Sequence, residues 1–375
     1  MKIAFDASAL VLPITGIGRY TQQLAKQLDL LKKYEDEIIY FYGPKYKESH
    51  YIRRDIIRSK HTHRNGIRGI QTIWEQLVLP KKLKKYEIDV YHSPRNKNIP
   101  YLKIKDTKII VTMHDTLAFL YPRKSIDKRI LLWRWKRVAK LADKIITVSN
   151  NSKKDLLTQF DFLQNQDVIV NYCGIDNKFK KENIESKRSK EVLAKYNINK
   201  PYLLATGSTE PVKNIKMIIK VMRRGVAKYK NIFVKHELII AGPKWPGKDI
   251  PDNLPENVRF IGYVEDRELP ILMNQARLFL FPSLYEGFGL PPLEALAAGT
   301  DVISSNTSSL PEVLGDAAVM ISPKDENLWL YKIKDILEKG KSKEFSSIRQ
   351  TQIDKFSWQR SAEEIYEIYK EVHTD

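Results

Sequence analysis

Short apolar runs alternate along this chain with segments in which apolar residues recur at helical spacing. Helical spacing marks residues 19–31, 74–83, 123–141, 215–222, 268–275, 328–338 and 357–372. This alternation predicts an α/β protein built on parallel sheets. The runs of strand length occupy residues 2–5, 38–42, 90–93, 108–112, 144–148, 168–170, 202–205, 238–241, 258–261, 278–281, 302–304 and 318–321.

The two halves of the chain repeat one architecture, because each opens with a strand, a glycine turn and a helix, as Rossmann-like domains do. Between them, residues 172–200 are polar and lysine-rich, which we interpret as an interdomain linker region. We expect one domain over residues 1–185, a second over residues 186–357, and a terminal helix over residues 358–375 that packs back on the first. Residues 46–68 are basic and poorly periodic, which predicts a loop.

Ligands of open α/β sheets bind at the carboxyl ends of the strands. Two such domains joined by a linker are expected to leave a cleft that the strand ends of both face. That arrangement brings Gly16 and His114 opposite Lys213 and Glu286, with domain closure as a gate.

Residues 277–299 are the most informative stretch, because they predict a strand, a glycine loop and a helix. Glu286 lies in the loop between Tyr285 and Gly287, and Glu294 is expected in the first turn of the helix. The amides of the loop and helix start suit a phosphate, and the two acids suit the hydroxyls of what the phosphate carries. The helix dipole alone favours an acid in a first turn by about 0.3–1 kcal/mol, so Glu294 taken singly also fits a structural role.

Two motifs in the first half of the chain are weaker evidence of a ligand site than residues 277–299. Gly16-Ile17-Gly18 lacks the third glycine of a dinucleotide motif, so it fits either a tight turn or a backbone that approaches a ligand closely. His114 and Asp115 follow a predicted strand, where a histidine is either simply buried and hydrogen-bonded or able to donate a hydrogen bond to a sugar or phosphate oxygen.

Composition narrows the class of partner. The chain has 375 residues and a formal net charge of +19, which favours an anionic partner. A lone Cys173 excludes an internal disulfide and suits the reducing cytoplasm. No run of 18 or more apolar residues and no signal peptide are expected. In the basic helix of residues 123–141, Trp133 and Trp135 fit either one packed and one solvated face or a contact with an anionic membrane surface.

These residues together resemble the retaining glycosyltransferases of family 4, which have the GT-B fold. The most specific match is residues 283–291 with Glu294, because Glu286 and Glu294 have the spacing of that family's E-x7-E signature. Residues 15–20, 114–115, 148–149, 207–214, 262–264, 309–313 and 356–358 also match. Within the family, the set is most similar to bacterial mannosyltransferase-like members that build surface polysaccharides.

The resemblance implies a role for each matching position. Glu286 is expected to contact the donor sugar, Glu294 the ribose and Lys213 the leaving diphosphate, while His114 touches the sugar near the reacting carbon. Transfer is expected to need no metal or other cofactor beyond the nucleotide diphosphate sugar that is its donor substrate. The remaining expected donor-site positions are the amides of Gly287, Phe288, Gly289 and Leu290, the backbone beside Tyr263 at the base, and Gly16, Gly18, Arg19 and Asp115 in the first domain.

The implied reaction moves a hexose, with mannose from GDP-mannose as the best guess, to a hydroxyl of a polyprenyl-diphosphate-linked or growing glycan in surface polysaccharide. A UDP-sugar-dependent enzyme and a degenerate relative are the alternatives. The second is motivated by Ser208 and Val212, which stand where relatives place an arginine. Asp301 stands where relatives usually have proline, which we interpret as a harmless loop change.

Two other classes compete with this interpretation. A glycoside hydrolase could use Glu286 and Glu294 as its carboxylate pair, but it would not need the phosphate seat. A nucleic-acid-binding protein would fit the charge, yet the basic residues are scattered and no recognition module is visible, so no nucleic acid is expected. We expect instead a protein bound peripherally to the inner face of the cytoplasmic membrane through residues 81–85 and 123–140.

Overall fold

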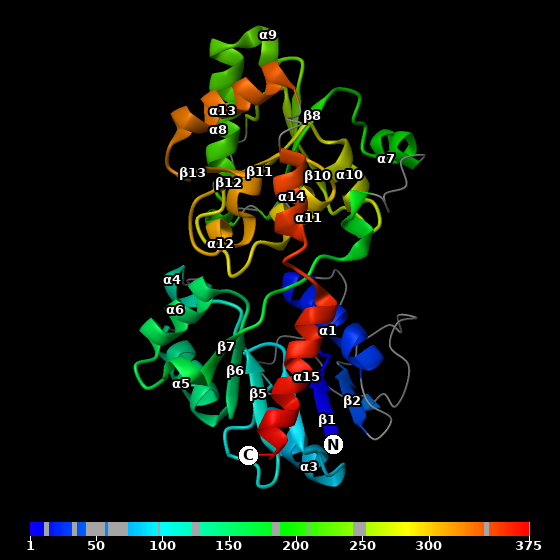
Figure 1. The fold of residues 1–375 in the computed structure, drawn as a ribbon. Coiled ribbons are helices and arrows are strands. Elements are labelled where there is room, and N and C mark those ends of the chain that lie inside the picture. The colour runs from blue at the N-terminus through cyan, green and yellow to red at the C-terminus, as the bar shows by residue number, and fades with distance from the viewer. Residues whose placement is uncertain are drawn as a thin grey trace. The chain divides into compact units, whose positions relative to one another are not determined.

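The computed structural model describes residues 1–10, 15–31, 36–42, 57–58, 74–96, 98–121, 128–181, 188–208, 210–242, 253–340 and 345–374. The chain forms two compact units (Figure 1), one made of Met1–Gly174 with Ser357–Asp375 and the other of Ile175–Phe356. Among the described residues, no helix is long and apolar enough to cross a membrane.

The first unit is built on a seven-stranded parallel sheet in the order β3-β2-β1-β4-β5-β6-β7. Its strands are β1 (Lys2–Asp6), β2 (Glu37–Tyr42), β3 (Ile57–Arg58), β4 (Val90–Ser93), β5 (Lys108–Thr112), β6 (Lys144–Thr147) and β7 (Val168–Val170). Its helices are α1 (Gly16–Leu31), η1 (Trp74–Val78), α3 (Leu79–Lys85), α4 (Leu117–Leu120), α5 (Lys128–Leu141), α6 (Asn150–Gln159), η2 (Asn165–Asp167) and the terminal α15 (Trp358–Thr374).

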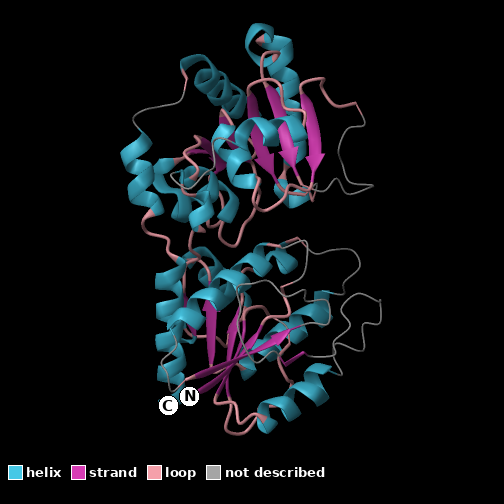
Figure 2. Cartoon of the chain, turned by 90° about the vertical axis from the view of Figure 1, so that its right-hand side faces the viewer, coloured by secondary structure: helices cyan, strands magenta, loops and turns pink. Residues whose placement is uncertain are grey.

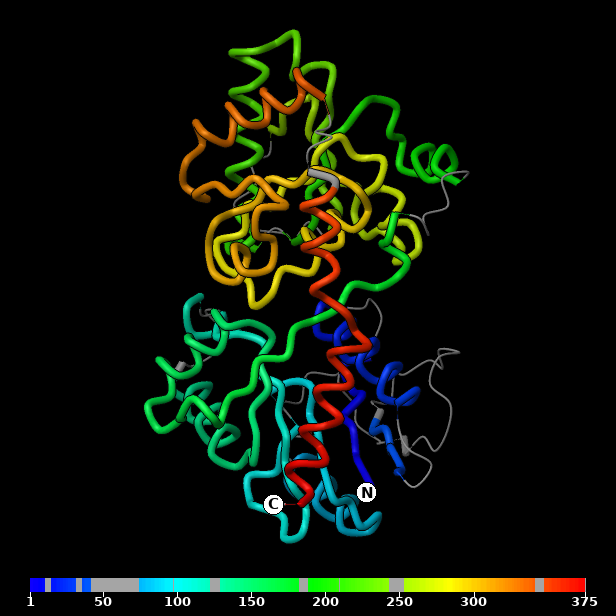
Figure 3. The backbone as a smooth tube through the Cα atoms, in the orientation of Figure 1, coloured from blue at the N-terminus to red at the C-terminus, as the bar shows by residue number. Residues whose placement is uncertain are grey.

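The terminal helix α15 belongs to the first unit, where it packs along α1 (Figure 3). Its Tyr369 is fully buried, and the Tyr369 hydroxyl lies 2.5 Å from Nδ1 of His92 on β4. Nε2 of His92 lies 2.9 Å from the hydroxyl of Thr112 on β5. Burial lowers the pKa of His92 to about 3, so the ring is neutral at pH 7 and joins α15 to the centre of the sheet.

The second unit has a six-stranded parallel sheet in the order β10-β9-β8-β11-β12-β13, with helices on both faces (Figure 2). Its strands are β8 (Tyr202–Thr206), β9 (Glu237–Ala241), β10 (Val258–Gly262), β11 (Leu278–Phe281), β12 (Val302–Ser305) and β13 (Val319–Ile321). Its helices are η3 (Asn177–Phe179), α7 (Ser189–Lys195), η6 (Pro211–Lys213), α8 (Ile215–Lys228), α9 (Lys230–Phe233), α10 (Leu269–Gln275), α11 (Leu290–Ala297), α12 (Leu310–Leu314), η7 (Gly315–Ala317), α13 (Glu326–Lys339) and α14 (Phe345–Ile353).

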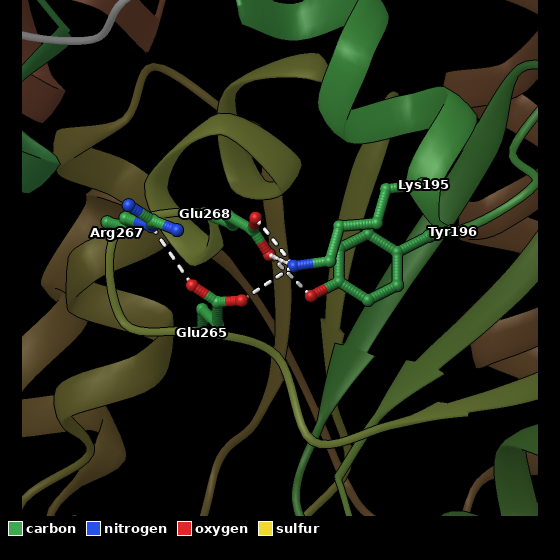
Figure 4. Close-up of polar contacts among 5 residues, drawn as sticks. All are labelled: Lys195, Tyr196, Glu265, Arg267 and Glu268. Carbon is green, nitrogen blue, oxygen red and sulfur yellow. Dashed lines mark hydrogen bonds and ion pairs between the residues drawn. The ribbon is translucent and has the colours of Figure 1, made fainter.

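The segment interpreted as a linker contains a helix, α7, that polar contacts fix to the second unit (Figure 4). Lys195 contacts both carboxylate oxygens of Glu268, at 2.8 and 2.9 Å, and one of Glu265 at 2.7 Å. Tyr196 donates to Glu268 at 2.6 Å. These acids raise the pKa of Lys195. The buried residues of α7 are Ser189 and Val192, and one buried apolar residue gives too sparse a pattern for periodicity to reveal the helix.

Three further local expectations need correction. Within residues 46–68, Ile57–Arg58 form the edge strand β3, and the rest of that predicted loop lies outside the described residues, as do residues 123–127 of the predicted basic helix. The sequence favours Asn150 or Asn151 as the cap of the helix that follows residues 144–148. The structure shows instead that Ser149 caps this helix, α6, because its hydroxyl accepts from the Ser152 amide. The helix expected over residues 74–83 is a π-helical turn followed by α3, because Pro80 suits only the start of an α-helix.

Candidate functional site

Glycines join the carboxyl ends of three neighbouring strands in the second unit. Gly207 after β8 donates to the Ala241 carbonyl of β9 at 3.0 Å, and Gly242 donates to the Gly262 carbonyl at 2.8 Å. A Cβ on Gly242 would lie 2.1 Å from the Gly207 carbonyl oxygen, so only glycine allows this approach. The strand ends thus form a tight backbone rim, which Tyr263 extends with a side chain that is 56% exposed.

Lys213 and Glu286 meet directly on this rim, although they are 73 residues apart. Lys213 ends the turn η6 after β8, and Glu286 lies in the loop after β11, which neighbours β8 in the sheet. The Lys213 ammonium donates to Glu286 Oε1 at 2.7 Å, and the two side chains are 24% and 14% exposed. The cation expected at the diphosphate is therefore paired with the carboxylate expected at the sugar.

Helix α11 starts one residue after Gly289. Gly289 is the N-cap with φ of +108°, a conformation suited to glycine, and prolines follow in the first turn. The helix begins at Leu290, so Glu294 is its fifth residue, and its expected place in the first turn was wrong. Glu294 is only 1% exposed. The helix dipole acts mainly within the first turn, so it does not account for Glu294. The burial of this carboxylate beside the expected phosphate site therefore needs another role.

The apolar residues of the loop anchor it. Phe288 is buried and packs edge-on against Phe356, with ring centroids 5.5 Å apart. Tyr285 is buried as well. The Leu284 amide donates to the Val212 carbonyl at 2.7 Å, so the loop is tied to the residue preceding Lys213. The backbone around Glu286 is therefore braced on both sides.

In the first unit, His114 follows β5 and contacts Tyr20 of α1 edge-on, with ring centroids 4.7 Å apart. Nε2 of His114 lies 2.9 Å from the Pro94 carbonyl, which can only accept, so Nε2 carries the proton. Burial lowers the pKa of His114 to about 4, so the ring is neutral at pH 7. Because that proton is committed to Pro94, Nδ1 of His114 is suited to accept a hydrogen bond from a sugar hydroxyl rather than to donate one.

The other site residues expected in the first unit lie next to His114 in the chain or at the start of α1. The Asp115 carboxylate accepts from the Leu117 amide at 2.9 Å and so starts α4. Gly16, Gly18 and Arg19 lie inside α1 rather than in a turn before it, because the Thr15 hydroxyl accepts from the Gly18 amide at 3.3 Å in the manner of an N-cap. A Cβ on Gly16 would meet nothing within 4 Å.

Two residues at which the chain departs from the family pattern, Val212 and Asp301, are buried in the structure. Val212 is buried, so its side chain contributes to packing and not to the charged rim. Asp301 is no mere loop change, because it is 8% exposed and accepts from Arg349 of α14 at 2.6 Å. Sequence reasoning missed this ion pair because its partners are far apart in the chain.

The structure thus brings Lys213 and Glu286 into contact and arranges Gly287, Phe288, Gly289 and Leu290 as one loop leading into α11. It places Tyr263 at the end of the edge strand β10, and His114 next to Tyr20 in the first unit. The meeting of the two sets over one ligand stays a prediction. Within the described ranges, no group of three or more His, Cys, Asp or Glu side chains is placed to hold a metal ion.

Comparison with known proteins identifies the family. Residues 187–351 match the family described as glycosyl transferases group 1, and residues 14–179 match the one described as glycosyltransferase family 4. The chain belongs to glycosyltransferase family 4. It is 29% identical to O-antigen chain mannosyltransferase B of Escherichia coli, over 99% of this chain and 100% of that protein. It is 31% identical to O-antigen chain mannosyltransferase RfbU of Salmonella typhimurium, over 60% of each chain.

Solved structures confirm the GT-B fold of this glycosyltransferase. Sucrose-phosphate synthase of Thermosynechococcus elongatus superposes with a TM-score of 0.76 at 18% identity, over 100% of this chain and 99% of that one. WaaG, a glycosyltransferase involved in lipopolysaccharide biosynthesis, superposes with a TM-score of 0.65 at 16% identity, over 99% and 98%. The prediction of two Rossmann-like α/β domains with parallel sheets is confirmed.

Proposed function

We propose that this family 4 enzyme transfers mannose from GDP-mannose, with retention of configuration, to a hydroxyl of a lipid-linked or growing glycan in surface polysaccharide synthesis. One observation supports the donor and pathway: a match over the whole length of an O-antigen mannosyltransferase, in a chain whose two halves match glycosyltransferase family models. UDP-sugars are the alternative donors. The cytoplasmic face of the membrane is the proposed location, because the lipid-linked acceptor would be presented there.

During the proposed sugar transfer, the protein must stabilise two developing charges. As the bond between sugar and diphosphate breaks, negative charge grows on the diphosphate, which Lys213 and the amides at the start of α11 would neutralise. Positive charge grows on the sugar, and Glu286 is proposed to hold its hydroxyls while the leaving phosphate takes the acceptor's proton. His114 would accept from a sugar hydroxyl through Nδ1, and Glu294 would hold the ribose. None of these roles requires a metal.

Substitution of Glu286 by glutamine tests this assignment, because the amide keeps the shape and removes the charge. We expect mannosyl transfer to fall about 10²-fold, while the melting temperature stays within a few degrees of the wild-type value. Near-normal turnover of the variant would refute the role of Glu286. A thermal-shift screen of GDP- and UDP-sugars identifies the donor, since only a bound ligand stabilises the fold. Release of GDP that requires an acceptor excludes a hydrolase, and binding of no nucleotide sugar supports a degenerate relative.

We also propose that α5 and residues 101–103 contact an anionic membrane surface. Ile130 and Trp133 share one face of α5 and are 59% and 55% exposed, whereas Trp135 is buried against Phe119. Trp133 packs edge-on against Tyr101, at 5.6 Å between centroids, which places it near the exposed Leu102. Exposed cations of the same unit include Lys103, Arg129 and Lys140, with Lys81, Lys84 and Lys85 on α3. Exposed apolar side chains on a basic unit suit the headgroup region of anionic bilayers.

Co-sedimentation with vesicles tests the membrane contact. Wild-type protein is expected to bind vesicles rich in anionic lipid, less so at high salt, and not neutral vesicles. Trp133→Ala should weaken this binding several-fold. Tyr331→Ala removes an equally exposed aromatic residue from the second unit and should leave binding unchanged. Equal loss in both variants would contradict a docking surface on α5.

A further inference from the structure

The loop that carries Glu286 is held by hydroxyls on the connection after β12. Ser309 is completely buried, and its hydroxyl lies 2.9 Å from the Glu286 carbonyl and 2.8 Å from the Phe288 carbonyl. A hydroxyl has one proton, so Ser309 shares it between the two carbonyls. Both carbonyls therefore face one buried atom, and their orientation is set together.

Because of peptide geometry, this contact also fixes the direction of two backbone amides. In a trans peptide, the C=O and N–H of one unit point in opposite directions. The Glu286 carbonyl shares its unit with the Gly287 amide, and the Phe288 carbonyl shares its unit with the Gly289 amide. Ser309 therefore turns both amides away from itself, and that of Gly289 lies at the start of α11, where a helix terminus attracts an anion.

Ser308 holds the same loop by another backbone group. Its hydroxyl accepts from the Glu286 amide at 2.9 Å and donates to the Thr307 carbonyl at 2.7 Å. Its φ is +51°, a left-handed conformation that residues with a side chain rarely adopt. Glycine would adopt this conformation more easily but could not bond the Glu286 amide. The hydroxyl therefore explains why serine suits position 308 better than glycine.

We propose that Ser309 and Ser308 are positioning residues for the donor loop. Ser309 aims the amides of Gly287 and Gly289 toward the donor diphosphate, and Ser308 fixes the backbone from which the Glu286 carboxylate extends. The identity of the ligand rests on the proposed function, whereas the orientation of the loop rests on the contacts alone. Neither serine has to touch the substrate.

Hydrogen exchange in the ligand-free protein tests the loop itself. Ser309→Ala and Ser308→Gly should each speed amide exchange in peptides covering residues 283–290 by about tenfold or more. Ser304→Ala is the matched control, because Ser304 is also completely buried but lies within β12, where it donates to the Ser305 carbonyl at 3.4 Å. It should leave exchange of the loop unchanged. Wild-type exchange in both loop variants would overturn the proposal, whatever their activity.

Binding and turnover test the link to the ligand. Ser309→Ala should raise the Kd for GDP about tenfold, because the amides are no longer aimed. Ser308→Gly should lower kcat for transfer from GDP-mannose about 10²-fold while leaving the Kd for GDP near the wild-type value. If wild-type protein binds and transfers but Ser309→Ala binds GDP normally, aiming at the diphosphate is refuted. If the loop responds in exchange while wild-type protein binds no nucleotide, the proposed function fails and the positioning of the loop stands.

Discussion

The contact between Lys213 and Glu286 predicts that two substitutions in one ion pair change nucleotide affinity in opposite directions. At 2.7 Å, the attraction is about 6 kcal/mol at an effective dielectric constant of 20. Desolvation of two side chains that are mostly buried offsets much of it, which leaves a net coupling of about 1–3 kcal/mol. A diphosphate that recruits Lys213 must compete with this coupling.

Replacing Glu286 by glutamine weakens the competitor, because a neutral hydrogen bond is about half as strong as a charge-assisted one. The difference of about 1 kcal/mol should tighten GDP binding about fivefold, even though transfer falls. Replacing Lys213 by alanine removes a charge-assisted bond worth about 1.5–3 kcal/mol, so GDP binding should weaken about tenfold or more.

Isothermal titration of each variant with GDP, and in parallel with UDP, measures these changes. Lys220→Ala is the control, because Lys220 pairs with Glu326 at 3.4 Å on the exposed face of α8 and should not affect nucleotide binding. If Glu286→Gln weakens GDP binding, the two residues do not compete for one charge, and the reasoning from the ion pair is wrong. A loss of affinity in Lys220→Ala as large as that in Lys213→Ala would show a general effect of net charge.

Three further predictions concern stability. Gly174→Ala should lower the free energy of unfolding by about 1–3 kcal/mol or more, because its Cβ would lie 2.0 Å from the Trp358 amide nitrogen; an unchanged melting temperature would refute this packing. Arg349→Ala should cost about 3 kcal/mol in urea unfolding, since it leaves the Asp301 carboxylate buried without its cation, and a smaller loss than in an exposed-pair variant would contradict a buried ion pair. His92 has a pKa of about 3 when folded and about 6.5 when unfolded, so the unfolded chain binds more protons between these values and stability falls as pH falls from 6.5. Between pH 6.5 and 5, His92→Gln should reduce this slope by about 1 kcal/mol per pH unit on average, and identical slopes would refute the neutral buried ring.

The sheets could be predicted from the sequence because strands buried on both faces are continuous apolar runs. The strand β3 was missed because two residues give no periodicity. Helix starts were predicted less well, since they depend on caps: Thr15 begins α1 and Gly289 begins α11 earlier than apolar spacing suggests. Helix α7 was missed because its position depends on the contacts of Lys195 with distant acids.

The candidate site likewise combines residues that the sequence predicts with residues that it does not. Residues at strand ends, such as Lys213 and Glu286, can be predicted, because parallel topology gathers the carboxyl ends of strands at one edge of a sheet. The supporting serines cannot, because a serine that bonds backbone carbonyls leaves no pattern in the sequence. Ser309 is in a stretch that matches the family, but its match alone does not reveal that its hydroxyl faces the Glu286 and Phe288 carbonyls.

The backbone contacts of the loop bear on the absence of the arginine that relatives place at the position of Ser208 or Val212. Val212 is buried, and its carbonyl binds the Leu284 amide, so this position joins two loops and its side chain adds no charge to the rim. At Gly207, the nearest neighbour of a Cβ would be the stem of Lys213, at 3.6 Å. The one lysine expected at the diphosphate is held by Glu286. Under the proposed function, an anion at this site would therefore depend more on the amides at the start of α11 than it would beside two cations. Ser309, which lies in a stretch that matches the family, is proposed to orient those amides, so oriented backbone would carry a larger share of the anion's stabilisation where the second cation is absent.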